Sequence, residues 1–358
     1  MTVDQLLKFA VDQGAADLYF QTGVPPRLRI KGQVREIDAP PLTDDQLRSF
    51  IRAIAPRGVV DDIDSAMVRG WDFSYGAQGL ARYRCNLFSN LGQPGLVIRI
   101  IMPKIRTIDE LHLPPVIREI AQARRGLTLM SGATGSGKST TLAAIVDLLN
   151  TSYYLKILTI EDPVEYEHKS QKSLVTHIEV GRDTPSFDHG LRQATRQAPD
   201  VILVGELRDP ETVQMALRAA DTGHQVLATI HSSNAAHTVE RLLAMVPPAT
   251  LPIAKEQLAK SLVGIISQRL TNSKQGERWP IVEVLRGDSV VSKYILENRI
   301  ADIADYIATG QRQMQTFDMH LLKLYHDGVL SGTAALDAAT NPEALALEMR
   351  MPGAIVPE

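Results

Sequence analysis

Residues Gly132–Thr140 read G-A-T-G-S-G-K-S-T. They follow the apolar run Leu127–Met130 and precede the apolar-rich residues 142–149, so the order is strand, glycine-rich turn, helix. This is the context that a phosphate-binding P-loop requires. The glycines let the backbone turn closely enough for its N–H groups to face phosphate oxygens, and the helix directs its positive dipole end to the same place. The stretch predicts a nucleoside triphosphate site in a parallel α/β sheet.

The whole loop is expected to bind the nucleotide: Gly132, Ala133, Thr134, Gly135, Ser136, Gly137, Lys138, Ser139 and Thr140. Lys138 is expected to meet the β- and γ-phosphates, and Ser139 to bind Mg²⁺. A purely structural turn is the alternative, and the flanking strand and helix argue against it. The residues therefore predict a nucleoside triphosphate and Mg²⁺ as cofactors; the resemblance described below implies that the nucleotide is ATP.

Composition narrows the class of protein. The chain has 358 residues, 44% of them hydrophobic and 22% charged, which suffices for two domains with sizeable cores. A net charge of −3 without a long basic run argues against a nucleic-acid partner. Cys85 is the only cysteine, which excludes an internal disulfide framework and a four-cysteine zinc site and fits the cytoplasm. We expect neither a signal peptide nor a transmembrane segment, so membrane association would go through a partner protein.

The order of predicted elements divides the chain into domains. Helical and alternating strand patterns mix in the first hundred or so residues, as in an α+β domain. Beyond it, apolar strands alternate with helices, as a parallel sheet with crossover helices requires. The expected organisation is an N-terminal domain over 1–102, a proline-containing linker over 103–116, a nucleotide-binding α/β domain with a helical C-terminal region over 117–345, and a loose tail over 346–358.

Acidic residues follow two of the expected parallel strands. Glu161, Asp162 and Glu165 follow the strand Lys156–Ile160. At the carboxyl end of a strand beside the P-loop strand, they would lie where open α/β sheets bind ligands. These carboxylates can serve as the general base, as acceptors for water molecules bound to magnesium, or as a contact to the ribose. The residue types do not decide among these roles. A solvated acidic loop with a helix cap is the alternative.

A second acid-ended strand is typical of a Walker B motif. Residues 200–206 read D-V-I-L-V-G-E, so Glu206 follows an apolar strand and is expected to hold magnesium with Ser139. Gly205 occupies a position where many such sites carry Asp. A buried strand that merely ends in Glu is the alternative interpretation.

Histidines and arginines complete the candidate set. His224 and His231 flank the next strand, and His231 is placed to sense the γ-phosphate; structural, hydrogen-bonded histidines are the alternative. A phosphoryl-transfer site gains rate from added positive charge, so arginines of the first domain are candidates to complete the pocket. These candidates are Arg82, Arg84 and Arg99. Simple solvation at the surface is their alternative.

Together these motifs resemble the secretion ATPase superfamily of type II and type IV systems, and specifically its pilus-retraction branch, the PilT/PilU type. The resemblance covers nearly the whole chain, and four stretches occur in the family's order and spacing. They are Walker A over 132–140, the Asp box I-L-T-I-E-D-P-V-E-Y-E-H over 157–168, Walker B over 200–209 and the His box over 222–242. The resemblance implies a smaller PAS-like α+β domain before a RecA-like P-loop ATPase domain with a parallel sheet.

The resemblance also implies roles and partners. Glu165 would be the general base, Glu206 the Walker B glutamate, and His224 and His231 the His-box residues. Arginines of the N-terminal strands would reach the nucleotide. The protein would be a homo-hexameric ATP-hydrolysing motor for type IV pilus retraction and twitching motility. It would be cytoplasmic, and peripheral at the inner membrane through a pilus platform protein.

Details of the sequence leave two other functions open. The absence of a tetracysteine insertion favours retraction over pilus assembly. Residues 290–297 differ from the A-I-R-N-L-I-R-E motif of retraction ATPases, and residues 196–200 and 313–318 look closer to the PilU type. An accessory ring subunit that supports a paralogous retraction ATPase and hydrolyses little ATP is therefore the main alternative. A RecA-like nucleic-acid motor is disfavoured, because no basic stripe or aromatic stacking surface is evident.

Overall fold

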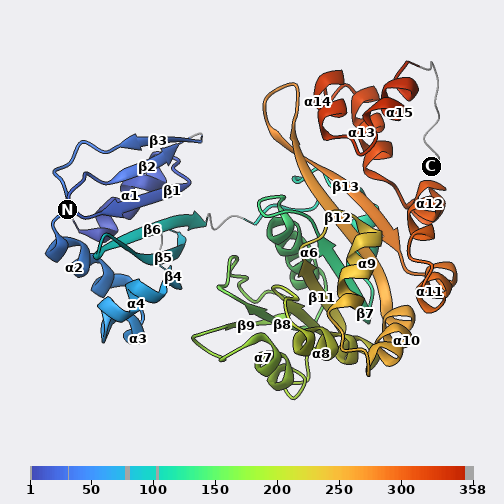
Figure 1. Ribbon diagram of the computed structural model, residues 1–358, viewed down its shortest axis with the longest axis horizontal. Helices are drawn as coiled ribbons and strands as arrows, with labels where there is room; N and C mark the ends of the chain where they lie inside the picture. Colours follow the sequence, from blue (N-terminus) through green and yellow to red (C-terminus); the bar gives the residue numbers. More distant parts are fainter. Residues whose placement is uncertain (1, 31, 77–80, 102–104, 351–358) are drawn as a thin grey trace. The chain divides into compact units, whose positions relative to one another are not determined.

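The computed structural model describes residues 2–30, 32–76, 81–101 and 105–350 (Figure 1). Contacts within the chain divide it into two compact units. The first comprises Met1–Lys104 and Pro163–Glu167, and the second comprises Ile105–Asp162 and His168–Glu358. Each unit has a sheet and a hydrophobic core of its own.

The first unit is an antiparallel six-stranded sheet in the order β3-β2-β1-β6-β5-β4. Its strands are β1 (Asp17–Gln21), β2 (Arg27–Ile30), β3 (Gln33–Glu36), β4 (Trp71–Gly76), β5 (Arg82–Asn90) and β6 (Gln93–Ile101). Its helices are α1 (Val3–Asp12), α2 (Asp44–Ile54), α3 (Arg57–Val60) and α4 (Ile63–Arg69). The sequence pattern did not predict α3 and α4.

Alternating side chains give this sheet one apolar face. On β5, Tyr83, Cys85 and Leu87 are fully buried, whereas Arg82 and Arg84, which alternate with them, are partly exposed. Because successive side chains of a strand point to opposite faces, the buried set packs against the helices and the arginines share the other face. This face carries the candidate arginines of the first unit.

The second unit is a seven-stranded sheet in the order β13-β12-β7-β11-β10-β8-β9. Its strands are β7 (Gly126–Ser131), β8 (Lys156–Glu161), β9 (Leu174–Glu179), β10 (Val201–Val204), β11 (Gln225–Ile230), β12 (Leu262–Asn272) and β13 (Arg278–Arg286). All neighbours pair in parallel except β12 and β13, which form an antiparallel hairpin. Edge strand β9 was not anticipated from the sequence.

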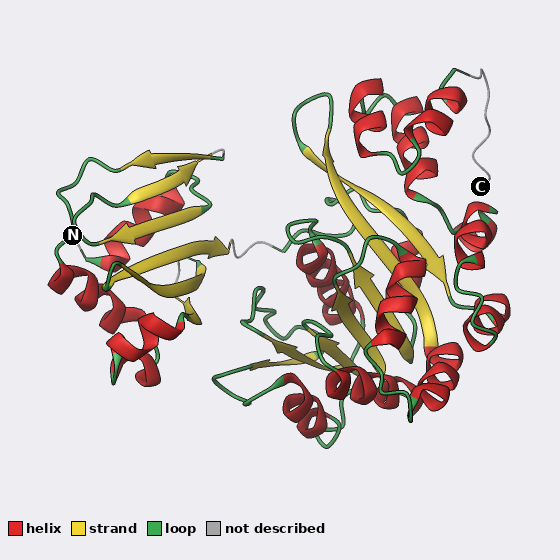
Figure 2. Cartoon of the chain, viewed as in Figure 1, coloured by secondary structure: helices red, strands yellow, loops and turns green. Residues whose placement is uncertain are grey.

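Helices lie on both faces of this sheet (Figure 2). They are α5 (Val116–Ala121), α6 (Lys138–Ser152), α7 (Phe187–Ala194), α8 (Pro210–Asp221), α9 (Ala235–Ala244) and α10 (Leu251–Ser261). Strand β7 is buried at every position, and its Leu127 and Leu129 face the core with α8 to α10, whereas Met130 faces the core with α5 and α6. Burial on both faces explains why the central strands read as continuous apolar runs rather than alternating ones.

Helices and a short turn follow the sheet up to residue 350, where the described residues end: α11 (Ser289–Leu296), α12 (Asp302–Ala308), the 3₁₀ turn η1 (Gln311–Gln313), α13 (Phe317–His326), α14 (Gly332–Ala338) and α15 (Pro342–Glu348). Helices α13 to α15 pack around Phe317 and Leu321 into a small core that also includes Ile281 of β13. Helix α15 extends three residues into the tail expected over 346–358, of which 351–358 lie outside the described residues. In the linker expected over 103–116, Ile108 and Leu111 are buried in the core of the second unit.

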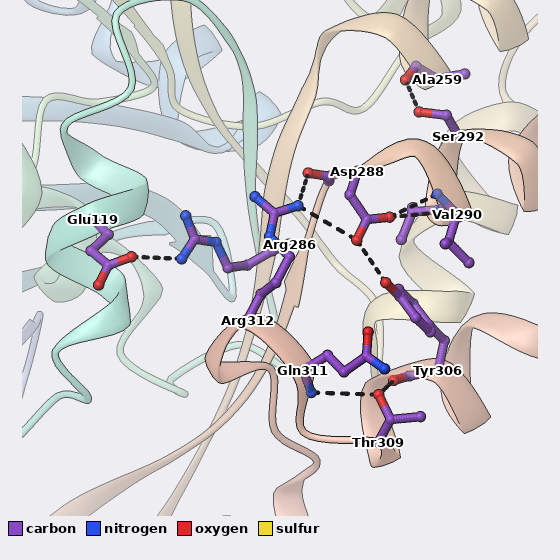
Figure 3. Close-up of polar contacts among 12 residues, drawn as sticks. Glu119, Ala259, Arg286, Asp288, Val290, Ser292, Tyr306, Thr309, Gln311 and Arg312 are labelled. Carbon is purple, nitrogen blue, oxygen red and sulfur yellow. Dashed lines mark hydrogen bonds and ion pairs between the residues drawn. The ribbon is translucent and has the colours of Figure 1, made fainter. Parts of the chain in front are cut away.

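Asp288 connects α11 to the chain segments that follow it (Figure 3). Its Oδ1 accepts hydrogen bonds from the amides of Val290 and Val291, and its Oδ2 accepts one of 2.7 Å from the Tyr306 hydroxyl. Arg312 lies 3.5 Å from the same Oδ2 and donates to the Gly287 carbonyl. Burial raises the pKa of Asp288, but these hydrogen bonds outweigh it and leave the pKa below its usual value.

The predicted fold class is confirmed: a RecA-like α/β domain with a mostly parallel sheet follows a smaller α+β domain. Among the described residues, no helix is both long and apolar enough to cross a membrane.

Candidate nucleotide-binding site

The P-loop connects the carboxyl end of β7 to the start of α6. Gly137, with φ of +90°, is the N-cap of α6, and Gly132 has φ of +145°. Both backbone conformations favour glycine. A Cβ atom at Gly137 would also lie 2.6 Å from the side-chain nitrogen of Gln268, so the loop needs glycine there for space as well. The helix that follows directs its unsatisfied N–H groups toward the loop.

The interior of the loop suits an anion. The Lys138 side chain is only 8% exposed, and its Nζ donates to the carbonyls of Gly132 and Ala133 at 2.8 and 2.9 Å. The Ser136 hydroxyl is buried without a hydrogen-bond partner in the described part of the chain. A buried hydroxyl normally has a partner, so this one fits a ligand oxygen such as that of a phosphate. The residues present therefore fit a bound nucleotide.

A pocket of about 640 Å³ adjoins the loop. This volume lies within the range usual for small-molecule sites. It is lined by Gly132, Ala133, Thr134, Gly135, Ser136, Ser233, Gln268, Arg269, Leu270, Thr271, Asn272 and Arg278. The lining from β12 and β13 was not predicted from the sequence, because these residues belong to none of the motifs and come next to the loop only through the pairing of β12 with β7.

Glu206 and His231 lie together beside the loop. Glu206 follows β10, and its Oε1 lies 3.4 Å from His231 Nε2, which follows β11. Because β10, β11 and β7 are parallel, the segments after them meet at the same edge of the sheet as the P-loop. Burial lowers the pKa of His231, and the charge of Lys138 adds to that effect. The structure thus brings the candidate residues Glu206, His231 and Lys138 close together.

Arg208 is a further member of this cluster, and it was not among the residues predicted from the motifs. Its Nη2 lies 2.7 Å from Glu206 Oε2. The hydrogen bond to Glu206 raises the pKa of Arg208, with the charge of Asp162 contributing. The signal was present in the sequence, since Arg208 stands two residues after Glu206 in the same motif.

The Asp-box residues divide between the two units. Glu161 ends β8, and its Oε1 lies 4.0 Å from His177 Nδ1 on β9. The segment Pro163–Glu167 belongs to the first unit. There Arg82 donates to the Val164 carbonyl at 2.9 Å, and Arg84 lies 3.9 Å from a Glu165 carboxylate oxygen. Two candidate arginines and the candidate base are thus neighbours.

Arg99 and His224 have other partners. Arg99 is directly opposite Arg84 in the ladder of β5 and β6, but its Nε donates to Asp17 on β1 at 2.9 Å. His224 precedes β11, and its Nδ1 lies 3.0 Å from the carbonyl of Ala219. It therefore lies where the parallel strands begin, whereas the P-loop lies where they end. Within one chain the structure does not bring His224 to the loop.

The fold and this site define the class: a P-loop nucleotide-binding protein of the RecA-like type, with acid-ended strands beside the loop. Residues 1–284 match the family model of the type II/IV secretion system proteins. The type IV pilus retraction ATPase PilT of Pseudomonas aeruginosa is 41% identical over 344 residues, which cover 96% of this chain and 99% of PilT. The type IV pilus ATPase PilU of the same species is 35% identical over 98% of this chain and 92% of its own length.

A solved structure agrees with these relatives. The crystal structure of the pilus retraction motor PilT with bound ADP matches this chain with a TM-score of 0.88 and 36% sequence identity. The match covers 97% of this chain and 99% of the PilT chain. The chain belongs to the type II/IV secretion system protein family. The resemblance to the pilus-retraction branch of the secretion ATPase superfamily is confirmed, because the matches extend over nearly the full length of both chains.

Proposed function

We propose that the protein is an Mg-ATP-hydrolysing motor that powers type IV pilus retraction and so twitching motility. The P-loop carries the proposal: Lys138 is buried, and the Ser136 hydroxyl is buried without a hydrogen-bond partner within the part of the chain that the structure describes. Glu206, which follows the acid-ended strand β10, lies 3.4 Å from His231. Full-length similarity to PilT supports the biological role. We further propose that the protein acts as a homo-hexamer, in the cytoplasm at the inner membrane, where a pilus platform protein would receive the movement.

The roles of the residues follow from their chemistry. Lys138 would hold the β- and γ-phosphates, and Ser139 and Glu206 would hold Mg²⁺, which would neutralise charge on the phosphates. Glu161 and Asp162 support the same site, and His231 senses the γ-phosphate. The arginines of the β5–β6 face, Arg82, Arg84 and Arg99, stabilise the charge that develops during transfer. In this proposal His224 contributes as a His-box residue without contacting the loop of its own chain.

The first test is steady-state Mg-ATP turnover by the purified protein, with Lys138→Ala as the blank. Loss of the ammonium removes the charge that holds the transferring phosphate, so we expect turnover of the variant to fall by at least a hundredfold. Thermal unfolding of both proteins checks that the variant is folded. Equal turnover by the two proteins would contradict the proposal.

The general base is tested separately. Glu165→Gln keeps the size of the side chain and removes its ability to accept a proton, so we expect turnover to fall by about 10²–10⁴-fold with ATP binding retained. Glu167→Gln is the matched control, because Glu167 is two residues away and also close to Arg82, at 3.8 Å. Normal turnover in Glu165→Gln would assign the base elsewhere.

The similarity to PilU over 98% of the chain favours one second candidate, an accessory ring subunit for a paralogous retraction ATPase. This subunit would bind ATP but hydrolyse little of it alone. Wild-type turnover at the level of Lys138→Ala, together with ATP binding and co-purification with another retraction ATPase, would favour this candidate over the autonomous motor.

A further inference from the structure

Gln268 lies against the P-loop although it belongs to none of the sequence motifs. It is 3% exposed and follows Ser267, which pairs with Ser131 at the end of the β12–β7 ladder. The hydroxyls of these two serines also form a hydrogen bond of 2.8 Å, which holds β12 to the end of β7. Gln268 is therefore the first residue of β12 beyond the ladder, at the level where the loop begins.

Both ends of the Gln268 carboxamide contact the loop and its helix. Nε2 donates a hydrogen bond of 2.7 Å to the Ser136 carbonyl, and Oε1 accepts one of 2.8 Å from the Thr141 hydroxyl in α6. Thr141 is 1% exposed, so both bonds are shielded from water. Loss of the donor to a buried carbonyl costs free energy of folding, because the carbonyl cannot bind water instead. The Gln268 side chain therefore stabilises the conformation of the loop backbone.

Two glycines of the loop are matched to Gln268. A Cβ atom at Gly137 would lie 2.6 Å from Nε2, and a Cβ atom at Gly132 would collide with the Gln268 backbone oxygen. The P-loop thus lies so close to β12 that no residue with a Cβ atom would fit at these two positions. Two of its glycines are required for contact with Gln268 as well as for their backbone angles.

The next residue anchors β12 on its other side. The Arg269 guanidinium lies 3.9 Å from the centre of the Phe317 ring, and its Nη1 donates to the Ala338 carbonyl. These contacts join β12 to helices α13 and α14. Gln268 therefore extends to the loop from a strand that is held in place on both sides.

We propose that Gln268 is a positioning residue for the nucleotide site, one that holds the P-loop in the shape that receives phosphate. By occupying the Ser136 carbonyl, it keeps that carbonyl turned away from the phosphate position and leaves the loop amides directed inward. By accepting from Thr141, it fixes the start of α6 relative to β12. The inference rests on the proposed nucleotide-binding function and names a residue that supports it without contacting the reacting atoms.

The test is the affinity of purified protein for ADP, measured by isothermal titration calorimetry. Gln268→Met keeps the length of the side chain and removes both hydrogen bonds, so we expect ADP to bind about tenfold to thirtyfold more weakly. Gln225→Met is the matched control. Gln225 is 2% exposed and donates a hydrogen bond of 2.7 Å to the Ala121 carbonyl. It lies at the start of β11, at the end of the same sheet that is remote from the P-loop. We expect the ADP affinity of Gln225→Met to stay within about twofold of wild type, although this variant loses stability as Gln268→Met does.

A second variant keeps the test decisive if Gln268→Met does not fold. Thr141→Val removes one of the two hydrogen bonds, and we expect a loss of about threefold to tenfold in ADP affinity. In the double variant the losses should not multiply, because both substitutions break the same contact. Unchanged ADP affinity in folded Gln268→Met, or an equal loss in Gln225→Met, would overturn the inference. Wild-type protein that binds no ADP would instead overturn the proposed function itself.

Discussion

At the scale of a single residue, His320 illustrates how burial makes stability depend on pH. It is 5% exposed, and its Nδ1 accepts a hydrogen bond from the Val282 amide. Burial lowers the pKa of His320 to about 4, with the charge of Lys323 contributing. The ordinary pKa of about 6.5 holds in the unfolded chain. Folding therefore favours the neutral ring, and the stability it contributes is complete above about pH 6.5 and declines as the pH falls toward 4.

Between pH 7 and pH 5 His320 becomes protonated in the unfolded chain but stays neutral in the folded one, so we expect the free energy of unfolding of the second unit to fall by about 2 kcal/mol. Urea unfolding of wild type and His320→Asn at the two pH values measures it. Asn retains an acceptor near the Val282 amide but does not titrate. The variant should be less stable at pH 7 and should lose about 2 kcal/mol less than wild type on going to pH 5. An identical pH dependence in both proteins would show that another group is responsible.

At the scale of an element, the hairpin of β5 and β6 has an unusual turn. Asn90 pairs with Gln93, which leaves Leu91 and Gly92 as a two-residue turn with φ of +52° and +79°. Positive φ at both positions is typical of a type I′ turn, for which Asn-Gly is strongly preferred. Leu91 is 98% exposed, so packing does not compensate for its strained backbone.

Replacing Leu91 with Asn should therefore stabilise the first unit by about 0.5–1 kcal/mol. Leu91→Val is the control, because a branched side chain is still less suited to positive φ and should destabilise the unit. Chemical unfolding of the three proteins gives the order of stability. If Asn proves no more stable than Leu, strain at this turn is not a significant cost.

At the scale of the whole molecule, the two cores and the position of the P-loop give a prediction about unfolding. Each unit buries its own cluster of apolar side chains, and the loop belongs to the second unit. We expect calorimetry to resolve two unfolding transitions, and ADP at a hundred times its dissociation constant to stabilise the second unit by about 2.7 kcal/mol. That free energy should raise its midpoint by about 2–4 °C and leave the other transition unchanged. A single transition that moves as a whole would contradict this prediction.

Local patterns of the sequence predicted most of the fold and the centre of the site. Glycine spacing between a strand and a helix identified the P-loop, and apolar runs ending in acids located Glu206 and Glu161, because these signals arise from neighbouring residues. Short helices such as α3 and the edge strand β9 were missed, since each is brief and only partly buried and so has weak periodicity.

The sequence by itself determined the class of fold, the loop and the order of its acidic strands. The tertiary structure alone decided which distant residues meet there. Gln268 reaches Ser136 across 132 positions of sequence because β12 pairs with β7, and Arg82 reaches Val164 across 82 positions because 163–167 groups with the first unit. His224 and His231 lie only seven residues apart in sequence, but the six-residue strand β11 separates them, so they lie at opposite ends of that strand. Strand pairing and strand direction act over the whole chain, and no local pattern of residues encodes them.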